Sequence, residues 1–391
     1  MHVDYTPEQN ALRRELRAYF ARLVTPEVRE RIRALEGGET HRALIRQMGE
    51  DGWLGIGWPR VWGGQGRSML EQLVFFEEVR RAGAPFPFVT LSTVGPALMT
   101  HGSEEQKAAF LPGILRGETH FAIGYTEPDA GTDLAALKTS AVRDGDAYVV
   151  NGTKIFTSGA NDADYIWLAA RSDPAAPRHK GISILILDTK LPGFSWSPIH
   201  TMGGGATTMT YYENVRVPVS LRVGPEDGGW TLITHQLNHE RIGLAAMGGA
   251  TLEIFDQVLR FVRETPGDDG RPLAEQPWVQ IALAEAHARL EAMKVLNWRV
   301  AWELEQGRLD PAHASAVKVY GSECQIEVYR LLLDVVGACG ALRSGSPGAA
   351  LQGRLESEAR GSQINTFGGG VNEIQREIVS MLGLGMPRVP R

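Results

Sequence analysis

Hydrophobic side chains recur at helical spacing through the first third of the chain. The pattern begins after Thr6-Pro7-Glu8, where a capping residue precedes a proline at the first helical position. It continues through the apolar residues Leu12, Leu16, Tyr19, Phe20 and Leu23. We expect further helices around Leu44 to Met48 and over residues 70–81, 88–99 and 104–115, interrupted by the Gly- and Trp-rich stretch GWLGIGWPRVWGGQGRS.

The middle third carries short β-rich runs instead. They read FAIGYTEPD, DAYVVNGTKIFTSG, DYIWLAARS, GISILILD and TMTYYENVRVP, and they are bounded by Gly, Asp, Asn and Pro. No helical pattern separates them, which favours an antiparallel sheet or a small barrel. The run from Tyr148 to Val150 leads into Asn151-Gly152, a dipeptide that predicts a hairpin turn at that point.

The last third returns to long helical patterns. They cover roughly residues 230–264, 277–306, 312–336 and 373–381, and the short loops between them are typical of an antiparallel bundle. The sequence therefore predicts an α+β fold in three parts. These are an N-terminal helical domain over 1–120, a central antiparallel β-barrel-like domain over 121–228 and a C-terminal four-helix bundle over 229–391.

Composition narrows the functional classes. The 40 basic and 46 acidic residues form no basic stripe, so we expect no nucleic-acid partner. The polar N-terminus and the lack of a long apolar run predict a cytoplasmic protein without a membrane span. Neither the 2 cysteines nor the 10 histidines have metal-site spacing, so we expect no metal. Neither a Rossmann nor a P-loop glycine motif occurs, so a bound dinucleotide would be held in another way.

Two segments of the β region carry the candidate chemistry. The first, YTEPDAGTD, runs from Tyr125 to Asp133, and by itself it is typical of a turn. The second, NGTKIFTSGAND, presents Phe156, Thr157 and Ser158 in succession, and by itself it is typical of a hairpin. Together, their hydroxyls, backbone groups and aromatic face could hold a flat heterocycle by stacking and hydrogen bonding.

With these two segments the sequence resembles the acyl-CoA dehydrogenase family. That family has a TEPxAGSD segment followed by a G-x-K-x-[WF]-[IT]-[ST]-x-[GA] segment, and this chain has TEPDAGTD and GTKIFTSGA at the matching distance. The resemblance continues in order through EEQKAAFLPGILRGE, VRVP, HERIG, VRETPG and NEIQREI. It implies the same three-part fold and FAD as cofactor, with the flavin ring between the β domain and the bundle.

The resemblance also assigns cofactor contacts. Arg263 corresponds to an arginine that reaches the FAD phosphates, usually those of a neighbouring subunit, a role that suits its planar fork of donors. Glu373 corresponds to a position on the ribose or adenine side of FAD. The residues that match the two flavin-contact motifs are Tyr125, Thr126, Gly131 and Thr132 in the first, and Phe156, Thr157 and Ser158 in the second.

The implied reaction is the α,β-dehydrogenation of an acyl-CoA thioester, which needs a carboxylate base for the α-proton. The glutamate of the family's Y-E-G-T segment is missing, because Gly369 stands at that position. Some family branches carry the base on the first bundle helix, which makes Glu240 in LNHERIG the candidate; its alternative is an ordinary surface Glu–Arg pair. Apolar neighbours would raise its pKa and strengthen it as a base. The resemblance places Thr132, Asn238 and Arg241 on the substrate side.

The resemblance further implies partners. We expect an electron-transferring flavoprotein as electron acceptor and a homo- or hetero-oligomer, including an α2β2 assembly like that of bacterial relatives acting on steroid side-chain thioesters. Asp334 stands where the family often has a glutamine facing the neighbour's FAD, and Gly368 to Gly370 could leave room for a branched or polycyclic acyl group. Two alternatives remain: an oxidase or flavin monooxygenase on the same fold, and a partner subunit with an incomplete site.

Overall fold

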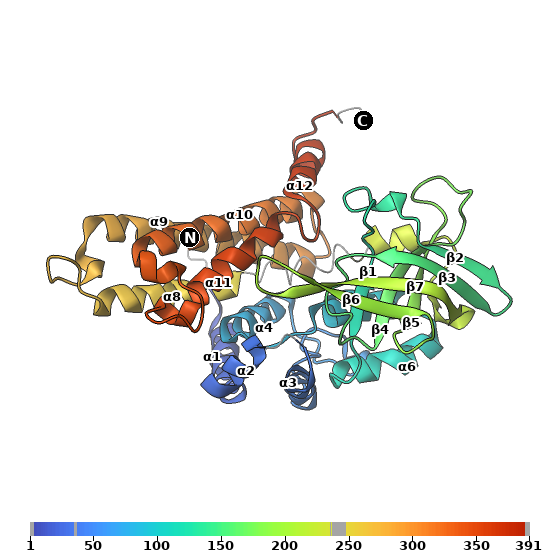
Figure 1. Cartoon of the computed structure of the whole chain (residues 1–391), viewed down its shortest axis with the longest axis horizontal. Coiled ribbons are helices and arrows are strands. Elements are labelled where there is room, and N and C mark those ends of the chain that lie inside the picture. Colours follow the sequence, from blue (N-terminus) through green and yellow to red (C-terminus); the bar gives the residue numbers. More distant parts are fainter. Residues whose placement is uncertain (1–3, 35–36, 235, 237–247, 388–391) are drawn as a thin grey trace.

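The computed structural model describes residues 4–34, 37–234, 236 and 248–387. The C-terminal helices lie at the left of the molecule and the sheet at the right, and the N-terminal helices run along the bottom, partly beneath the sheet (Figure 1). The fold class expected from the sequence is confirmed: helices come first, a sheet follows, and helices close the chain.

Capping residues in the sequence mark the starts of several N-terminal helices. Thr6 caps the first helix in a capping box with Gln9, and Pro7 occupies its first position, as expected. The predicted helix over 88–99 is different, because Val89–Val94 form a π-helical turn before the next α-helix starts. The helices are α1 (Pro7–Leu23), α2 (Pro26–Ala34), α3 (Glu39–Glu50), α4 (Met69–Ala82), α5 (Gly95–His101) and α6 (Glu104–Leu115).

Within the described residues, one sheet of eight strands occupies the middle of the chain. Its order is β6-β7-β3-β2-β4-β5-β8, and β1 also pairs with β4. Most neighbours are antiparallel, but β1 and β2 each pair with β4 in parallel. The strands are β1 (Phe121–Gly124), β2 (Ser140–Asp144), β3 (Ala147–Lys154), β4 (Tyr165–Arg171), β5 (Ile182–Asp188), β6 (Phe194–His200), β7 (Ala206–Pro218) and β8 (Arg222–Val223).

The prediction of a hairpin turn at Asn151-Gly152 is wrong. Strand β3 continues through this dipeptide, and its register against β7 shifts between Val150 and Gly152, which marks a β-bulge. The turn lies earlier, between β2 and β3, where Gly145 has a φ of 63°. Gly152 has a φ of 150° and a Cβ there would lie 2.7 Å from the Thr139 Cα, so this glycine serves a close approach of backbones rather than a turn.

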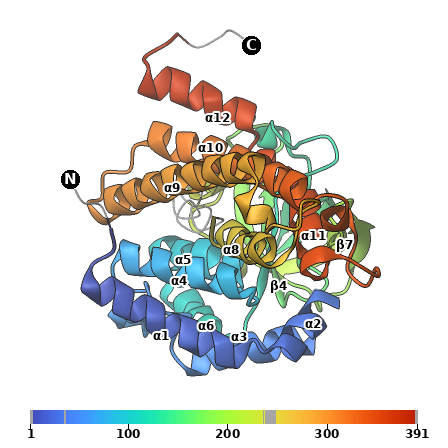
Figure 2. The same cartoon turned by 90° about the vertical axis from the view of Figure 1, so that its left-hand side faces the viewer.

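The C-terminal helices pack as an antiparallel group. Helices α9 and α10 lie side by side above α8, and α12 projects away from the body (Figures 1 and 2). Of the helix expected over 230–264, residues 230–234, 236 and 248–264 are helical, and 235 and 237–247 lie outside the described residues. The helices are α8 (Gly248–Glu264), α9 (Pro277–Glu305), α10 (Pro311–Val336), α11 (Arg354–Gly361) and α12 (Asn372–Ile378).

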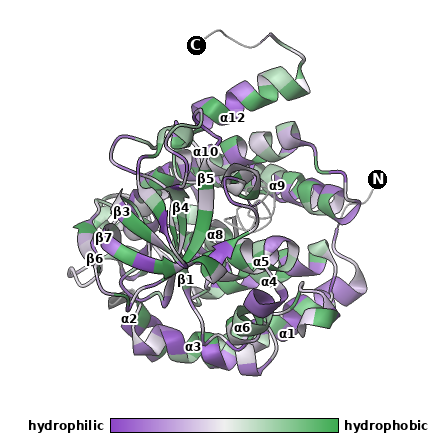
Figure 3. Ribbon diagram, turned by 90° about the vertical axis from the view of Figure 1, so that its right-hand side faces the viewer, coloured by the Kyte–Doolittle hydropathy of each residue, from purple (hydrophilic) through white to green (hydrophobic). Residues whose placement is uncertain are grey.

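The largest core crosses the three parts. It joins the N-terminal helices to the inner strands and to α9, with Leu16, Trp167 and Trp298 among its members. Strand β5 contributes a nearly continuous apolar run and is mostly green in Figure 3. Across the described ranges, every helix is too short or too polar to cross a membrane.

Candidate active site

The first motif segment leaves strand β1 and folds back on itself. Glu127 and Ala130 exchange backbone hydrogen bonds of 3.1 Å in both directions, which closes the turn TEPDA. The carbonyl oxygen of Thr126 accepts from the Ile155 N–H at 2.9 Å, directly after strand β3. The two motif segments, separated in sequence, are therefore hydrogen-bonded neighbours.

The second motif segment presents an exposed ring beside a row of hydroxyls. Phe156 has a φ of 60°, which is strained for a residue with a side chain, and it is 59% exposed. Thr157 is buried; its N–H donates to the Thr208 carbonyl at 2.9 Å, and its hydroxyl lies 3.2 Å from that of Thr210. The Ser158 and Thr207 hydroxyls are 2.8 Å apart.

A buried ion pair lies behind these segments. The ammonium of Lys154 donates to Glu127 Oε1 and to the Tyr125 carbonyl oxygen, both at 2.9 Å. Burial lowers the pKa of Lys154 to about 8, although Glu127 acts in the opposite direction. Burial would raise the pKa of Glu127, but Lys154 and the hydrogen bond from Thr139 outweigh burial and lower it. Both groups are thus held charged at neutral pH.

The sequence reasoning missed this pair. Lys154 falls on the same face of β3 as buried Tyr148 and Val150, and a lysine in such a position is rarely buried without a partner. The alternation of buried and less buried positions along β3 could therefore have indicated that Lys154 is buried with a partner. The identity of the partner could not be read from it, because Glu127 lies 27 residues away in sequence.

Tyr125 belongs to a chain of polar groups at the edge of the site. Its hydroxyl accepts from Trp167 Nε1 at 3.0 Å and donates to Gln236 Oε1. Gln236 is 3% exposed, and among the described residues its Nε2 is a buried donor without a partner. A buried amide donor beside the flavin-contact motif fits a ligand with carbonyl or ring-nitrogen acceptors, which a flavin has. Sequence reasoning did not select Gln236.

Gly131 and Thr132 lie on the exposed part of the first segment. A Cβ at Gly131 would meet only the Thr126 methyl at 3.9 Å, so the packing of this chain leaves space on that side. Asp133 follows and pairs with Arg178 at 3.3 Å. Together with the exposed ring and the unpartnered amide, this space makes the residues compatible with the FAD that the resemblance implies.

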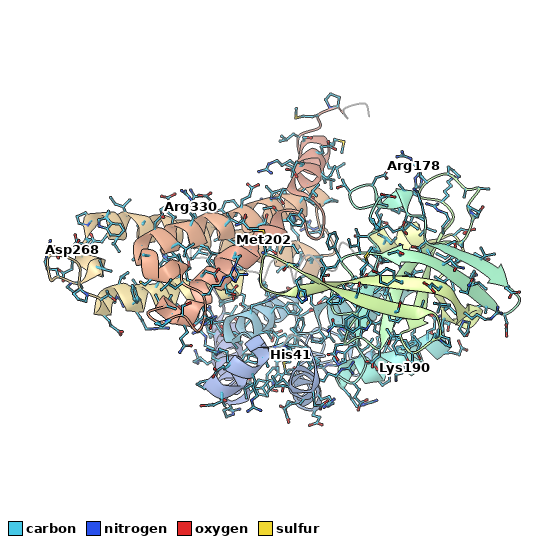
Figure 4. All side chains as sticks on the ribbon, viewed as in Figure 1. His41, Arg178, Lys190, Met202, Asp268 and Arg330 are labelled. Carbon is cyan, nitrogen blue, oxygen red and sulfur yellow. The ribbon has the colours of Figure 1, made fainter. Side chains whose placement is uncertain are left out.

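Arg263 and Glu373 do not join this group. Arg263 is exposed in the last turn of α8, the helix that precedes the loop of Asp268, and this loop lies at the end of the molecule opposite the sheet (Figure 4). Glu373 is exposed in the first turn of α12 and faces Lys318, whose pKa burial lowers to about 8 against the effect of Glu373. Within one chain, Arg263 is therefore remote from the flavin-contact segments.

The glycine loop that replaces the usual base segment is anchored at both ends. Asn365 donates to Gln325 at 2.9 Å, and Asn372 accepts from Lys318 at 2.7 Å. Between them Gly369 and Gly370 have φ values of 68° and 99°, which favour glycine. No carboxylate side chain occupies the loop at this point.

The candidate base Glu240 and two of the expected substrate contacts, Asn238 and Arg241, lie outside the described residues. In the part of the chain that the structure describes, His, Cys, Asp and Glu side chains do not gather into a group that could hold a metal.

Comparisons with known proteins cover nearly the whole chain. The family models of the acyl-CoA dehydrogenase N-terminal, middle and C-terminal domains match residues 6–118, 122–215 and 227–383. Members of this family bind FAD.

Individual proteins match over their full lengths. The chain is 50% identical over 402 residues to acyl-CoA dehydrogenase FadE26 of Mycobacterium tuberculosis, with 100% of both chains covered. The solved structure named "Tcur3481-Tcur3483 steroid ACAD" is 55% identical with a TM-score of 0.96, and 100% of each chain is covered. The ChsE4-ChsE5 complex from Mycobacterium tuberculosis is 51% identical with a TM-score of 0.95 and the same coverage.

Proposed function

This chain belongs to the acyl-CoA dehydrogenase family, and from that premise we propose that it oxidises a CoA thioester between its α and β carbons using bound FAD. FAD, when bound, accepts the hydride that leaves the β carbon. The protein supplies the binding surface, the orientation of the two partners and the base.

The observation that carries this proposal is the joining of the two motif segments. The hydrogen bond from Ile155 to Thr126 brings the hydroxyls of Thr157 and Ser158 next to the turn that begins at Tyr125. The exposed ring of Phe156 offers a face for stacking, and Gln236 offers an unpartnered amide donor. These groups suit a planar, acceptor-rich ring better than a flexible ligand.

We propose Glu240 as the base that removes the α-proton. The support is sequence alone: the usual position holds Gly369, a residue that cannot accept a proton. The neighbours Asn238 and Arg241, together with Thr132, would contact the thioester and CoA. In the sequence, Glu240 is flanked by the apolar residues Leu237, Ile242 and Leu244, and apolar surroundings strengthen a carboxylate as a base.

The proposed acyl group is bulky, of the steroid side-chain class. One full-length relative is named a steroid ACAD, and this chain shares 55% of its residues. The glycines at 368 to 370 carry no side chains at the place where other family members have a glutamate, and this leaves space for a wide substrate. We propose that the electrons then pass to an electron-transferring flavoprotein.

We also propose that the chain assembles with a second acyl-CoA dehydrogenase chain. Two full-length structural relatives are named as two-component proteins. On α9, exposed apolar residues and alanines recur beside the exposed polar residues Gln280, Glu285, His287 and Arg299, more often than a solvent-facing helix needs. The α9 outer stripe consists of Trp278, Ile281, Ala284, Ala288, Ala292, Val295 and Trp302, all of them exposed. A further helix would cover it, and Arg263 could reach FAD held by a neighbouring chain.

The experiment is anaerobic bleaching of the flavin by linear, branched and steroidal acyl-CoA thioesters. We expect the purified protein to be yellow and to bleach most rapidly with a steroidal thioester. The Glu240→Gln variant should keep its FAD and lose at least 1000-fold in bleaching rate, since the amide cannot take the proton (about 4 kcal/mol). Undiminished bleaching would show that another residue is the base.

The same measurement separates the rival functions. An oxidase would release hydrogen peroxide at the rate of substrate turnover in air, whereas a dehydrogenase needs an added electron acceptor. A partner subunit with an incomplete site would be folded and colourless when purified alone. Either result would replace the proposed function.

A further inference from the structure

A buried ion pair joins the two flavin-contact segments, and no step of the proposed chemistry uses it. The Lys154 side chain is 0% exposed and that of Glu127 is 7% exposed, so the pair is shielded from water. Buried pairs of this kind add little net stability, because desolvation offsets their attraction. What such a pair does fix is the relative position of the segments that carry it.

Three segments of the chain converge on this pair. Glu127 Oε2 accepts from the Lys138 N–H at 2.6 Å, and Oε1 accepts from the Thr139 N–H at 2.8 Å, at the approach to β2. Lys154 donates to Glu127 and to the Tyr125 carbonyl, both at 2.9 Å, from the end of β3. The turn, the approach to β2 and the end of β3 are thereby tied at one point.

The residues proposed to contact FAD flank this point on both sides. Tyr125 and Thr126 precede Glu127 directly, and Phe156 lies two residues after Lys154. Within the described ranges, the hydrogen bonds of the pair run to backbone groups and between its two members. Its influence on a ligand is therefore through the spacing of the two segments.

We propose that Glu127 and Lys154 are positioning residues that fix the distance between the two flavin-contact segments and thereby set the affinity for FAD. This rests on the proposed function, because it takes these segments as the flavin site. Neither residue is expected to contact the reacting atoms. Loss of the pair should weaken the affinity for FAD and change the surroundings of the bound flavin.

The test compares Glu127→Gln, Lys154→Met and the double variant of the full-length protein. For each, the FAD dissociation constant of the stripped protein, the absorption spectrum of bound FAD and the unfolding temperature of the apoprotein are measured. Each single variant leaves a buried unpaired charge, so both unfolding temperature and FAD affinity fall. In the double variant the unfolding temperature recovers towards wild type, whereas FAD affinity stays at least tenfold weaker with a shifted spectrum.

Glu78→Gln is the matched control. Glu78 is a buried carboxylate in α4 that accepts from Arg13 and Arg17 at 2.9 Å, away from the motif segments. Its loss should lower the unfolding temperature and leave FAD affinity unchanged.

A Glu127→Gln/Lys154→Met double variant with wild-type FAD affinity and spectrum would overturn the inference. Should it not fold, Glu127→Asp, which keeps the charge but shortens its reach, decides on the same two readouts. A wild-type protein that does not bind FAD contradicts the proposed function instead.

Discussion

At the scale of single residues, Lys154 shows how burial and a charged neighbour oppose each other. Burial lowers the pKa of its ammonium to about 8, from 10.5 in the absence of structure, even though Glu127 works against this. Because the folded-state pKa is the lower one, holding the proton costs free energy below pH 8. That cost disappears as the pH rises from 8 to 10.5.

The variant Lys154→Met should lack this change of stability with pH. Methionine does not titrate, so between pH 8 and 10.5 the wild type should gain roughly 3 kcal/mol in free energy of unfolding relative to the variant. Urea denaturation of both apoproteins at several pH values in this range gives the difference. A difference that does not change with pH would mean that Lys154 keeps its proton throughout.

At the scale of elements, capping residues and hydrophobic periodicity predicted the helices whose ends depend on the local sequence. The capping residue Thr6 and Pro7 start α1, and α6 covers the expected residues 104–115. The prediction of a turn at Asn151-Gly152 was wrong because a glycine also allows two backbone segments to lie close together. Here the backbone of Gly152 lies close to that of Thr139. The meeting of the two motif segments followed from the family resemblance. The Glu127–Lys154 pair and Gln236 did not, since they depend on three-dimensional contacts that periodicity does not encode.

The shift in register opposite Gly152 leads to a prediction about this residue. A Cβ in Gly152→Ala would lie 2.7 Å from the Thr139 Cα and the residue would keep a φ of 150°, so either strand β2 or β3 must move. We expect a loss of about 2–4 kcal/mol in free energy of unfolding, measured by chemical denaturation. The control Gly145→Ala, which has a φ of 63° but nothing within 4 Å of the new Cβ, should cost only about 1 kcal/mol. Equal losses would argue that steric contact at Thr139 is unimportant.

At the scale of the whole molecule, the α9 outer stripe exposes large apolar side chains along one helix. Ile281 is 69% exposed and Trp278 is 52% exposed at one end, while Val295 and Trp302 are each 49% exposed at the other. The alanines between them allow a facing helix to approach closely. Arg263 is remote from the flavin-contact segments of its own chain, which agrees with an assembly in which cofactor contacts come from two chains.

Charges placed on the stripe should disrupt that assembly. We expect the Ile281→Glu/Val295→Glu double variant to sediment as a smaller species than the wild type, because two carboxylates would be buried against apolar surface. Sedimentation velocity gives the masses. Gln280→Glu, an exposed residue of α9 outside the stripe, is the matched control and should assemble normally. An unchanged mass for the double variant would place the interface elsewhere.

The core that crosses all three parts has a consequence for how the chain is made. Leu16 near the start of the chain shares one apolar cluster with Trp167 in the sheet and with Trp298 in α9. As the ribosome releases the chain from its N-terminus, the first helices emerge long before the residues that cover them. Their apolar faces can pack on one another early, but the part of the cluster that Trp298 completes stays open until about three quarters of the chain has been made, so the full core closes late in synthesis.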